Sequence, residues 1–178
     1  PFTGITVSGS DEIRGRKSKA ALSFGDEGGE LLVQVAISPV DSDGALRNLE
    51  SGWVGFDFAG TREAARRAWL EELAPFEVQG ADDGELAVLA TALYHSFIAP
   101  NLFSDVDGRY RGMDREIHTA EGRNQYTVFS LWDTYRATHP LFTLMQRART
   151  NDFAATALSH YREGGRLPVW ELAGNETD

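Results

Sequence analysis

The sequence contains no cysteine, which excludes a disulfide framework, a thiolate metal site and a cysteine nucleophile. It also has no apolar run long enough to cross a bilayer, so we expect no membrane span. Basic residues are few: 17 Lys and Arg stand against 27 Asp and Glu, a net charge of −10 at pH 7. Because the phosphates of nucleic acids repel such a chain, we expect no nucleic-acid partner.

The start of the chain lacks both the basic region and the apolar core of a signal peptide. The sequence begins without Met and stops directly after an apolar segment, so we expect an internal fragment of a longer polypeptide. A length of 178 residues is enough for one sizeable core or for parts of two domains.

Residues that favour strands are concentrated in the first part of the chain. Short runs of such residues occupy 4–7 and 20–24, and the segment 31–37 alternates between apolar and polar positions. These patterns predict strands of an antiparallel sheet. Turn-forming residues at 41–44 then precede 45–50, which can form one or two helical turns.

From residue 61 onward the apolar residues follow a helical period. A spacing of three or four residues predicts a helix from residue 61 to near Pro75. Asp82 and Glu85 have the spacing of a capping box, which predicts the start of a second helix that ends before Pro100.

Two more helices are predicted towards the end of the chain. Ser130 and Asp133 repeat the capping-box spacing, and the helix should end or restart at His139, because Pro140 suits a first helical position. The last helix should run from about Asn151 to the glycines at 164–165, with Phe153, Ala157 and Tyr161 on one face. Strands followed only by helices favour an all-β module and then a helical domain.

The segment 101–126 is rich in Gly, Asp and Arg, and it is predicted to be a long functional loop. The carboxylates within its part 104–114 have two interpretations, a calcium loop or a hairpin in which Asp107 and Gly108 supply the turn. Arginines at 109 and 111 stand where a calcium loop needs oxygen ligands, which favours the hairpin.

Other motifs with chemical potential are weak. The histidines at 95, 118, 139 and 160 lack the spacing of two ligands on one helix face, so we expect hydrogen-bonded structural roles and no zinc site. The glycosylation acceptor pattern at 175–177 is interpreted as accidental. No strained serine turn or phosphate-binding glycine loop is present.

Carboxylates next to aromatic residues remain as candidates. Asp133 follows Trp132, and Glu171 follows Trp170 shortly before Glu176. Sugar-binding sites use this combination, since an aromatic face covers the C–H groups of a sugar ring while carboxylates accept hydrogen bonds from its hydroxyls. The alternative is that the two tryptophans belong to the core.

Three blocks of sequence, 92–110, 126–141 and 167–177, together resemble glycoside hydrolase family 92. The most specific block contains Trp132-Asp133-Thr134-Tyr135-Arg136 shortly before His139-Pro140-Leu141, and the resemblance extends from about residue 31 to the end. It implies a bacterial, secreted or cell-surface, calcium-dependent exo-acting alpha-mannosidase, which often cleaves alpha-1,2 linkages with inversion. Its implied partners are mannose-containing glycans and the rest of its own polypeptide.

The resemblance also implies a fold that is α+β by segment. Residues 1–55 would be the C-terminal part of a β-sandwich, 56–80 a linker helix, and 81–178 the N-terminal part of an (α/α)6 barrel. The general acid, the general base and most calcium ligands of the family would lie outside this chain. No catalytic or metal-binding residue is therefore assigned here, and the chain alone is expected to be inactive.

The resemblance places one candidate substrate-binding group within the chain. Asp133 matches the aspartate that binds hydroxyls of the terminal mannose, and Trp132 and Arg136 would shape or brace the same pocket. Trp170 and Glu176 lie in a motif near that site, without an assigned contact. The rival hypothesis is a noncatalytic carbohydrate-binding or interaction module on the same scaffold.

Overall fold

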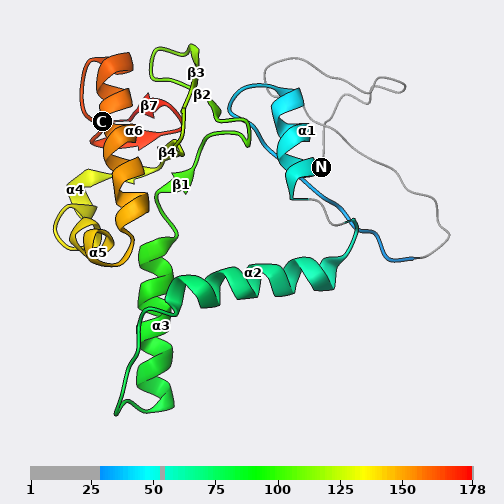
Figure 1. Cartoon of the computed structure of the whole chain (residues 1–178), viewed down its shortest axis with the longest axis vertical. Coiled ribbons are helices and arrows are strands. Elements are labelled where there is room, and N and C mark those ends of the chain that lie inside the picture. Colours follow the sequence, from blue (N-terminus) through cyan, green and yellow to red (C-terminus); the bar gives the residue numbers. More distant parts are fainter. Residues whose placement is uncertain (1–28, 53–54, 178) are drawn as a thin grey trace, which may run out of the picture. The chain divides into compact units, whose positions relative to one another are not determined.

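The computed structural model describes residues 29–52 and 55–177 (Figure 1). The helices in this part of the chain are α1 (Ser42–Ser51), α2 (Phe58–Leu73), α3 (Asp83–Phe97), α4 (Leu131–Thr134), α5 (Thr138–Met145) and α6 (Arg147–Gly164). The strands are β1 (Asn101–Leu102), β2 (Arg109–Arg111), β3 (Ile117–Thr119), β4 (Tyr126–Thr127), β5 (Phe129–Ser130), β6 (Trp170–Leu172) and β7 (Asn175–Glu176). All of them belong to the compact unit 33–178.

The predicted strand at 31–37 is not formed. The alternation is present, but its apolar side chains are solvent exposed, and Ile37 reaches 83% exposure. A strand exists only through a hydrogen-bonded neighbour, and no described residue pairs with this segment. The predicted strands at 4–7 and 20–24 lie outside the described residues.

The first three helices confirm the predictions from periodicity and capping. α1 begins after Asp41 and α2 after Asp57, and in each case the aspartate side chain accepts a hydrogen bond from a backbone N–H of the first turn. At α3 the predicted capping box is complete: the Glu85 N–H donates to Asp82 at 2.9 Å, and the Asp82 N–H donates to Glu85 at 3.0 Å. α1 and α2 each start three residues before the predicted position, because the capping aspartates precede the apolar stripe.

The segment 101–126 contains four short strands, so the prediction of one long loop is wrong. β1 pairs with β4 and β2 pairs with β3, both antiparallel. The β2–β3 hairpin turns at 112–116, where the Gly112 N–H donates to the Glu116 carbonyl at 2.8 Å. Asp107 and Gly108 belong instead to a tight turn before β2, in which Gly108 has a φ of +81°.

The predicted helix from Ser130 to His139 is broken into α4 and α5, and Pro140 is the third residue of α5 rather than the first. Ser130 makes no capping hydrogen bond, because its backbone belongs to β5 and pairs with Trp170 of β6. Its hydroxyl donates directly to the Asp133 carboxylate at 2.5 Å. The capping-box prediction at this position is therefore wrong.

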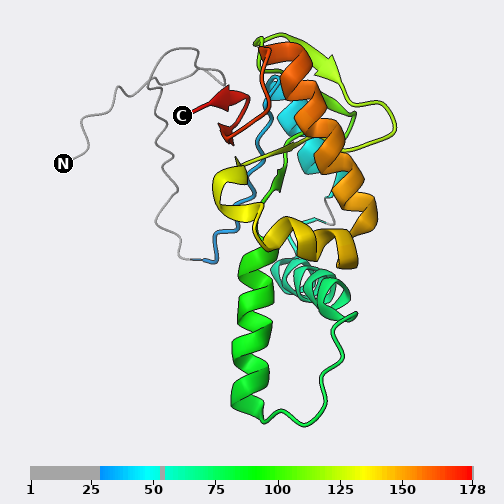
Figure 2. The same ribbon diagram turned by 90° about the vertical axis from the view of Figure 1, so that its left-hand side faces the viewer.

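An aromatic core joins α5 and α6 to the short strands. It consists of Tyr126, Phe129, Phe142 and Phe153, and the Tyr126 and Phe153 rings meet edge to face at 4.7 Å. Figure 2 shows α6 beside α5, in line with the contacts between them. α6 ends at the left-handed Gly165, close to the predicted stop.

The buried face of α6 differs from the predicted one. Phe153 is buried, but Tyr161 is 54% exposed, and Thr156, Ser159 and His160 occupy the interior instead. Polar groups that are buried generally need hydrogen-bond partners to replace water. The Thr156 hydroxyl accepts a hydrogen bond from the Tyr126 N–H at 3.2 Å. An apolar stripe alone could not predict such a polar face.

Strands also occur after the helices begin, so the order of strands followed only by helices is wrong. β5 directly precedes α4, and β6 and β7 follow α6; together they form a three-stranded antiparallel sheet in the order β5–β6–β7. The content is mixed α and β, as the fold-class prediction states, whereas the division into sandwich, linker and barrel at 1–55, 56–80 and 81–178 stays a prediction.

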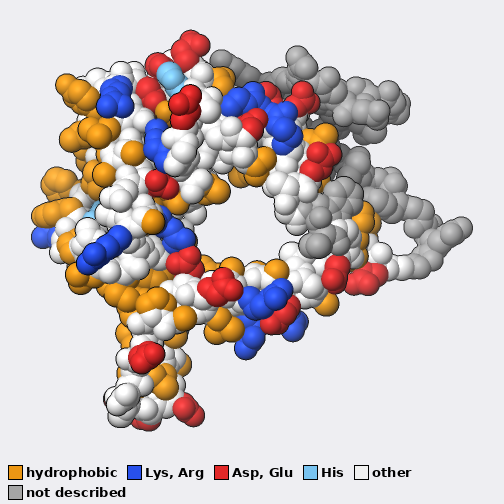
Figure 3. Space-filling view, viewed as in Figure 1, with side chains coloured by type: hydrophobic (Ala, Val, Ile, Leu, Met, Phe, Trp, Pro, Cys, Tyr) orange, Lys and Arg blue, Asp and Glu red, His pale blue; other side chains and the backbone are white. Residues whose placement is uncertain are grey.

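The described surface differs in character between helices. Figure 3 shows charged side chains gathered over α2, whereas hydrophobic side chains are prominent along α3 and around α4 and α5. Within the described residues, no helix has the length and apolar content needed to cross a membrane.

Candidate functional site

The β5–β6–β7 sheet brings together residues that are far apart in the sequence. Ser130, at the end of β5, lies opposite Trp170, the first residue of β6. The Ser130 hydroxyl donates to Asp133, and the Leu131 N–H donates to the Val169 carbonyl at 3.0 Å. The segment that carries Asp133 is thus fastened to the segment that carries Trp170.

Both candidate tryptophans are exposed. Trp132 on α4 is 66% exposed and Trp170 on β6 is 44% exposed. Neither indole belongs to the core formed by the described residues. The Asp133 carboxylate is exposed as well. Exposed carboxylates and aromatic rings are the groups that bind the hydroxyls and the C–H faces of a sugar.

Arg136 is not brought to Asp133. Its guanidinium carbon lies 5.0 Å from the centre of the Tyr135 ring, a cation–π contact. Within the described residues, no ion pair joins Arg136 to Asp133. The predicted role of Arg136 in shaping the pocket therefore stays a prediction, with Tyr135 as its observed neighbour.

Glu176 on β7 braces the main chain at the start of β6. Its carboxylate accepts hydrogen bonds from the N–H groups of Val169 and Trp170, both at 2.8 Å, and of Thr177 at 3.1 Å. The observed role of Glu176 is thus to fix the main chain at Trp170, and its membership of the substrate-binding site stays a prediction.

Glu171 stands next to Trp170 among the carboxylates noted in the sequence, but it was not assigned to the substrate-binding site. It points to the opposite face of β6 from Trp170 and is only 2% exposed. The Gly174 N–H donates to its carboxylate at 2.7 Å, the Thr127 hydroxyl at 3.0 Å and the Val128 N–H at 3.1 Å. Burial raises the pKa of this carboxyl, although the same hydrogen bonds oppose the rise. The sequence signal for this buried carboxylate was its position as the single polar residue of β6, between Trp170 and Leu172.

Backbone strain is concentrated around Glu171. Among the described residues, the non-glycine positions with positive φ are Arg115, Val128 and Ala173. Val128, at φ 66°, is a β-branched residue in a region that such residues rarely adopt. Ala173 and Gly174, at φ 50° and 76°, form a two-residue turn of the type I′ sense between β6 and β7.

The carboxylates of the 104–114 segment do not converge on a common point. Asp105 is 3% exposed and accepts hydrogen bonds from the Ser38 hydroxyl at 2.6 Å and the Asn48 amide at 2.7 Å. It therefore fastens α1 to the turn before β2. No shared ion is needed to account for its burial.

The other two carboxylates of this segment have different partners. Hydrogen bonds from the Arg109 backbone and guanidinium hold the pKa of Asp107 below its usual value. Asp114 binds His118 at 2.9 Å, and this contact and the Glu116 N–H lower its pKa although burial opposes the shift. No group of three or more His, Asp or Glu residues suited to a metal ion occurs in the described part of the chain. A hairpin is present in this segment, as that interpretation states, but its turn lies at 112–116 and not at Asp107 and Gly108.

The histidines differ in their surroundings. His118 has the expected hydrogen bond to Asp114. His139 packs against the Phe142 ring at 5.6 Å, and burial lowers its pKa. His160 is 2% exposed, and its Nδ1 has no hydrogen-bond partner in the described structure, so the expectation of a hydrogen bond is wrong for this atom. Burial lowers the pKa of His160 to about 4.

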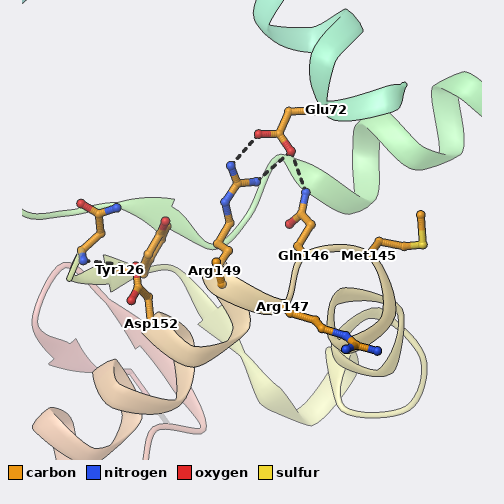
Figure 4. Close-up of a pocket in the computed structure, with 9 residues that line it drawn as sticks. Glu72, Tyr126, Met145, Gln146, Arg147, Arg149 and Asp152 are labelled. Atoms are coloured by element: carbon orange, nitrogen blue, oxygen red, sulfur yellow. Dashed lines mark hydrogen bonds and ion pairs between the residues drawn. The ribbon is translucent and has the colours of Figure 1, made fainter. Parts of the chain in front are cut away.

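A separate pocket of about 440 Å³ lies between α2 and the start of α6 (Figure 4). Glu72 of α2 pairs with Arg149 at 2.6 Å and accepts a hydrogen bond from Gln146 at 2.9 Å. The Asp152 carboxylate accepts a hydrogen bond from the Asn124 N–H at 3.2 Å. None of the predicted site residues lines this pocket, and its central charges neutralise each other, so we assign it a structural role in joining α2 to α6.

Residues 44–178 match the family model of the glycosyl hydrolase family 92 catalytic domain. A family GH92 alpha-mannosidase from Bacteroides thetaiotaomicron is 39% identical with a TM-score of 0.74, over 79% of this chain and 19% of that chain. Its complex with mannoimidazole matches with the same identity, TM-score and share of this chain, and with 18% of that chain.

A family GH92 inverting mannosidase from the same organism is 27% identical with a TM-score of 0.72, over 78% of this chain and 19% of that chain. No curated protein is significantly similar to the sequence. The chain spans about a fifth of the length of these solved structures. By the family match over most of its length and by its likeness to these mannosidases, the chain belongs to glycosyl hydrolase family 92.

Proposed function

We propose that the protein containing this chain releases terminal alpha-linked mannose from glycans. The observation that carries the proposal is the family match over 44–178 together with 39% identity to an alpha-mannosidase. That relative has been solved in complex with mannoimidazole, which supports a mannose-containing glycan as the substrate class.

In this proposal the surface formed by Trp132, Asp133 and Trp170 contributes to the binding of the terminal sugar. The Asp133 carboxylate accepts hydrogen bonds from mannose hydroxyls, and the exposed indoles cover the C–H faces of the sugar. Arg136 and Glu176 act around this contact, Glu176 through its hold on the Trp170 main chain. The exposure of all three binding groups supports this role.

The finer chemistry is also part of the proposal: hydrolysis of alpha-1,2 linkages with inversion. Inversion requires one carboxylic acid that protonates the leaving oxygen and one carboxylate that activates water, about 6.5 to 9.5 Å apart. We place both outside this chain. We likewise propose calcium dependence, with ligands mostly outside this chain, and a secreted or cell-surface location, as the family resemblance implies.

The test is to incubate the full-length protein with an alpha-1,2-linked mannobioside and follow the products by proton NMR. Beta-mannose formed first would indicate inversion, and alpha-1,3- and alpha-1,6-linked mannobiosides would measure the linkage preference. A calcium chelator should suppress turnover, and residues 1–178 alone should show none. Binding of mannosides without turnover by the full-length protein would contradict the proposal and favour a noncatalytic carbohydrate-binding module.

A further inference from the structure

Glu171 and Thr127 form a buried polar pair behind the candidate sugar-binding surface. Thr127 is 6% exposed and Glu171 2% exposed, and the Thr127 hydroxyl donates to the Glu171 carboxylate at 3.0 Å. The same hydroxyl oxygen accepts a hydrogen bond from the Ala173 N–H at 2.7 Å. The pair therefore links β4, β6 and the turn between β6 and β7.

The groups that this pair binds have unusual backbone conformations. Val128 and Gly174, which have positive φ angles, donate their N–H groups to Glu171, and Ala173, which also has a positive φ, donates to Thr127. Strained conformations persist only where the surrounding structure determines them, and they occur preferentially at functional sites. Here one carboxylate and one hydroxyl supply the partners.

The position of the turn sets the position of the candidate site. Ala173 and Gly174 connect β6 to β7, so they fix how Glu176 approaches β6. Glu176 in turn accepts hydrogen bonds from the main chain at Trp170, and Trp170 pairs with Ser130, which binds Asp133. The buried pair is thus connected to Asp133 by hydrogen bonds to the turn, by the short chain segment from the turn to Glu176, and by the hydrogen bonds of Glu176, Trp170 and Ser130.

We propose that Glu171 and Thr127 are positioning residues that fix the Ala173–Gly174 turn, and that this turn holds Trp170 and Glu176 in place for glycan binding. The second half of this proposal rests on the proposed function, whereas the first half concerns the fold alone. Neither side chain needs to touch the sugar, since both are buried.

Two substitutions remove the hydrogen bonds without a large change of shape. In Glu171→Gln, either orientation of the amide places an NH₂ group against a backbone N–H, that of Val128 or that of Gly174. Thr127→Val removes the hydroxyl, and Thr127→Ser retains it as the conservative variant. Thr156→Val is the matched control, because Thr156 is equally buried and binds the Tyr126 N–H rather than the turn.

The first measurement is hydrogen–deuterium exchange of the full-length proteins over the segment 169–177. We expect exchange to accelerate by at least about tenfold in Glu171→Gln and Thr127→Val, and to stay near the unmodified protein's rate in Thr127→Ser and Thr156→Val. Unchanged exchange in both Glu171→Gln and Thr127→Val would overturn the proposal, whatever the activity of the protein.

The second measurement is steady-state hydrolysis of an aryl alpha-mannoside by the same proteins. We expect kcat/KM to fall at least about tenfold in Glu171→Gln and Thr127→Val, mainly through a higher KM, with Thr127→Ser and Thr156→Val close to the unmodified enzyme. If exchange is faster but the kinetics are unchanged, the buried pair fixes the turn without serving the site, and this result would overturn the positioning role. If the unmodified full-length protein hydrolyses no mannoside, the proposed function fails. The exchange measurement alone then decides whether Glu171 and Thr127 fix the turn.

Discussion

The substitution Asp133→Asn separates a sugar contact from a structural role. The side chain is exposed, and its observed partner is the Ser130 hydroxyl, which donates to the carboxylate. An asparagine oxygen can accept the same hydrogen bond, and the carboxylate makes no capping bond whose loss would weaken α4. The free energy of unfolding should therefore change by no more than about 0.5 kcal/mol, as is usual for exposed positions.

The expected loss of activity is much larger. A hydrogen bond from a neutral donor to a charged acceptor contributes about 1.5 to 3 kcal/mol. If a mannose hydroxyl donates to Asp133 in the transition state, replacing the carboxylate by an amide should lower kcat/KM by about 10- to 150-fold. The melting temperature of the unliganded full-length protein should remain almost unchanged, since this contact exists only when the sugar is bound.

The assay compares aryl alpha-mannoside kinetics and thermal unfolding of full-length variants. Asp83→Asn is the control, because Asp83 is an exposed carboxylate in the first turn of α3, on a different element from α4. Ser130→Ala retains the Asp133 charge but removes the hydroxyl that orients it, so its kcat/KM should fall between those of the unmodified enzyme and Asp133→Asn. The reasoning would be refuted if Asp133→Asn lowered the melting temperature by several degrees and left kcat/KM within about twofold.

Three further experiments test the packing and the titratable groups of the fold. Gly44→Ala should lower the free energy of unfolding by about 1 to 3 kcal/mol in chemical denaturation, because the new methyl group would clash with the buried Asp105 carboxylate. The pKa of His160 is lowered from 6.5 to about 4 in the folded protein, so as the pH falls the unfolded chain takes up this proton before the folded chain does. The free energy of unfolding should therefore decrease between pH 6.5 and pH 4, by at most about 3 kcal/mol. His160→Asn should reduce this decrease. A double-mutant cycle on Glu72 and Arg149 should give a coupling below about 1 kcal/mol that salt weakens, because both side chains are more than a third exposed.

Helix starts could be predicted from the sequence where the capping interaction is local. Asp82 and Glu85 lie three residues apart, and both of their hydrogen bonds are present in the structure. The same spacing failed at Ser130 and Asp133 because the Ser130 backbone pairs with Trp170, a partner that no local pattern reveals. The difference is between an interaction within one turn of helix and one that depends on tertiary contacts.

The short strands could not be predicted for a related reason. β4, β5 and β7 contain two residues each, which is too short to display a period of two. Their pairing depends on neighbours such as β1 and β6, so the segment 101–126 has the composition of a loop although it supplies strands. Trp132 and Trp170 are exposed within the described residues, and their role in sugar binding stays a prediction.

The buried pair behind that surface left almost no trace in the sequence, and energetics explains why it is nevertheless informative. Positive φ angles at Val128 and Ala173 cost on the order of 1 to 3 kcal/mol each. Hydrogen bonds to the charged Glu171 carboxylate contribute about 1.5 to 3 kcal/mol each, enough to offset this strain. An apolar residue in place of Glu171 would leave the Val128 and Gly174 N–H groups without these partners, at a cost of about 1 to 3 kcal/mol each, so the strained backbone and the carboxylate depend on each other. The strained backbone and the buried carboxylate together fix the geometry of the turn, and that geometry determines where Glu176 meets the Trp170 main chain.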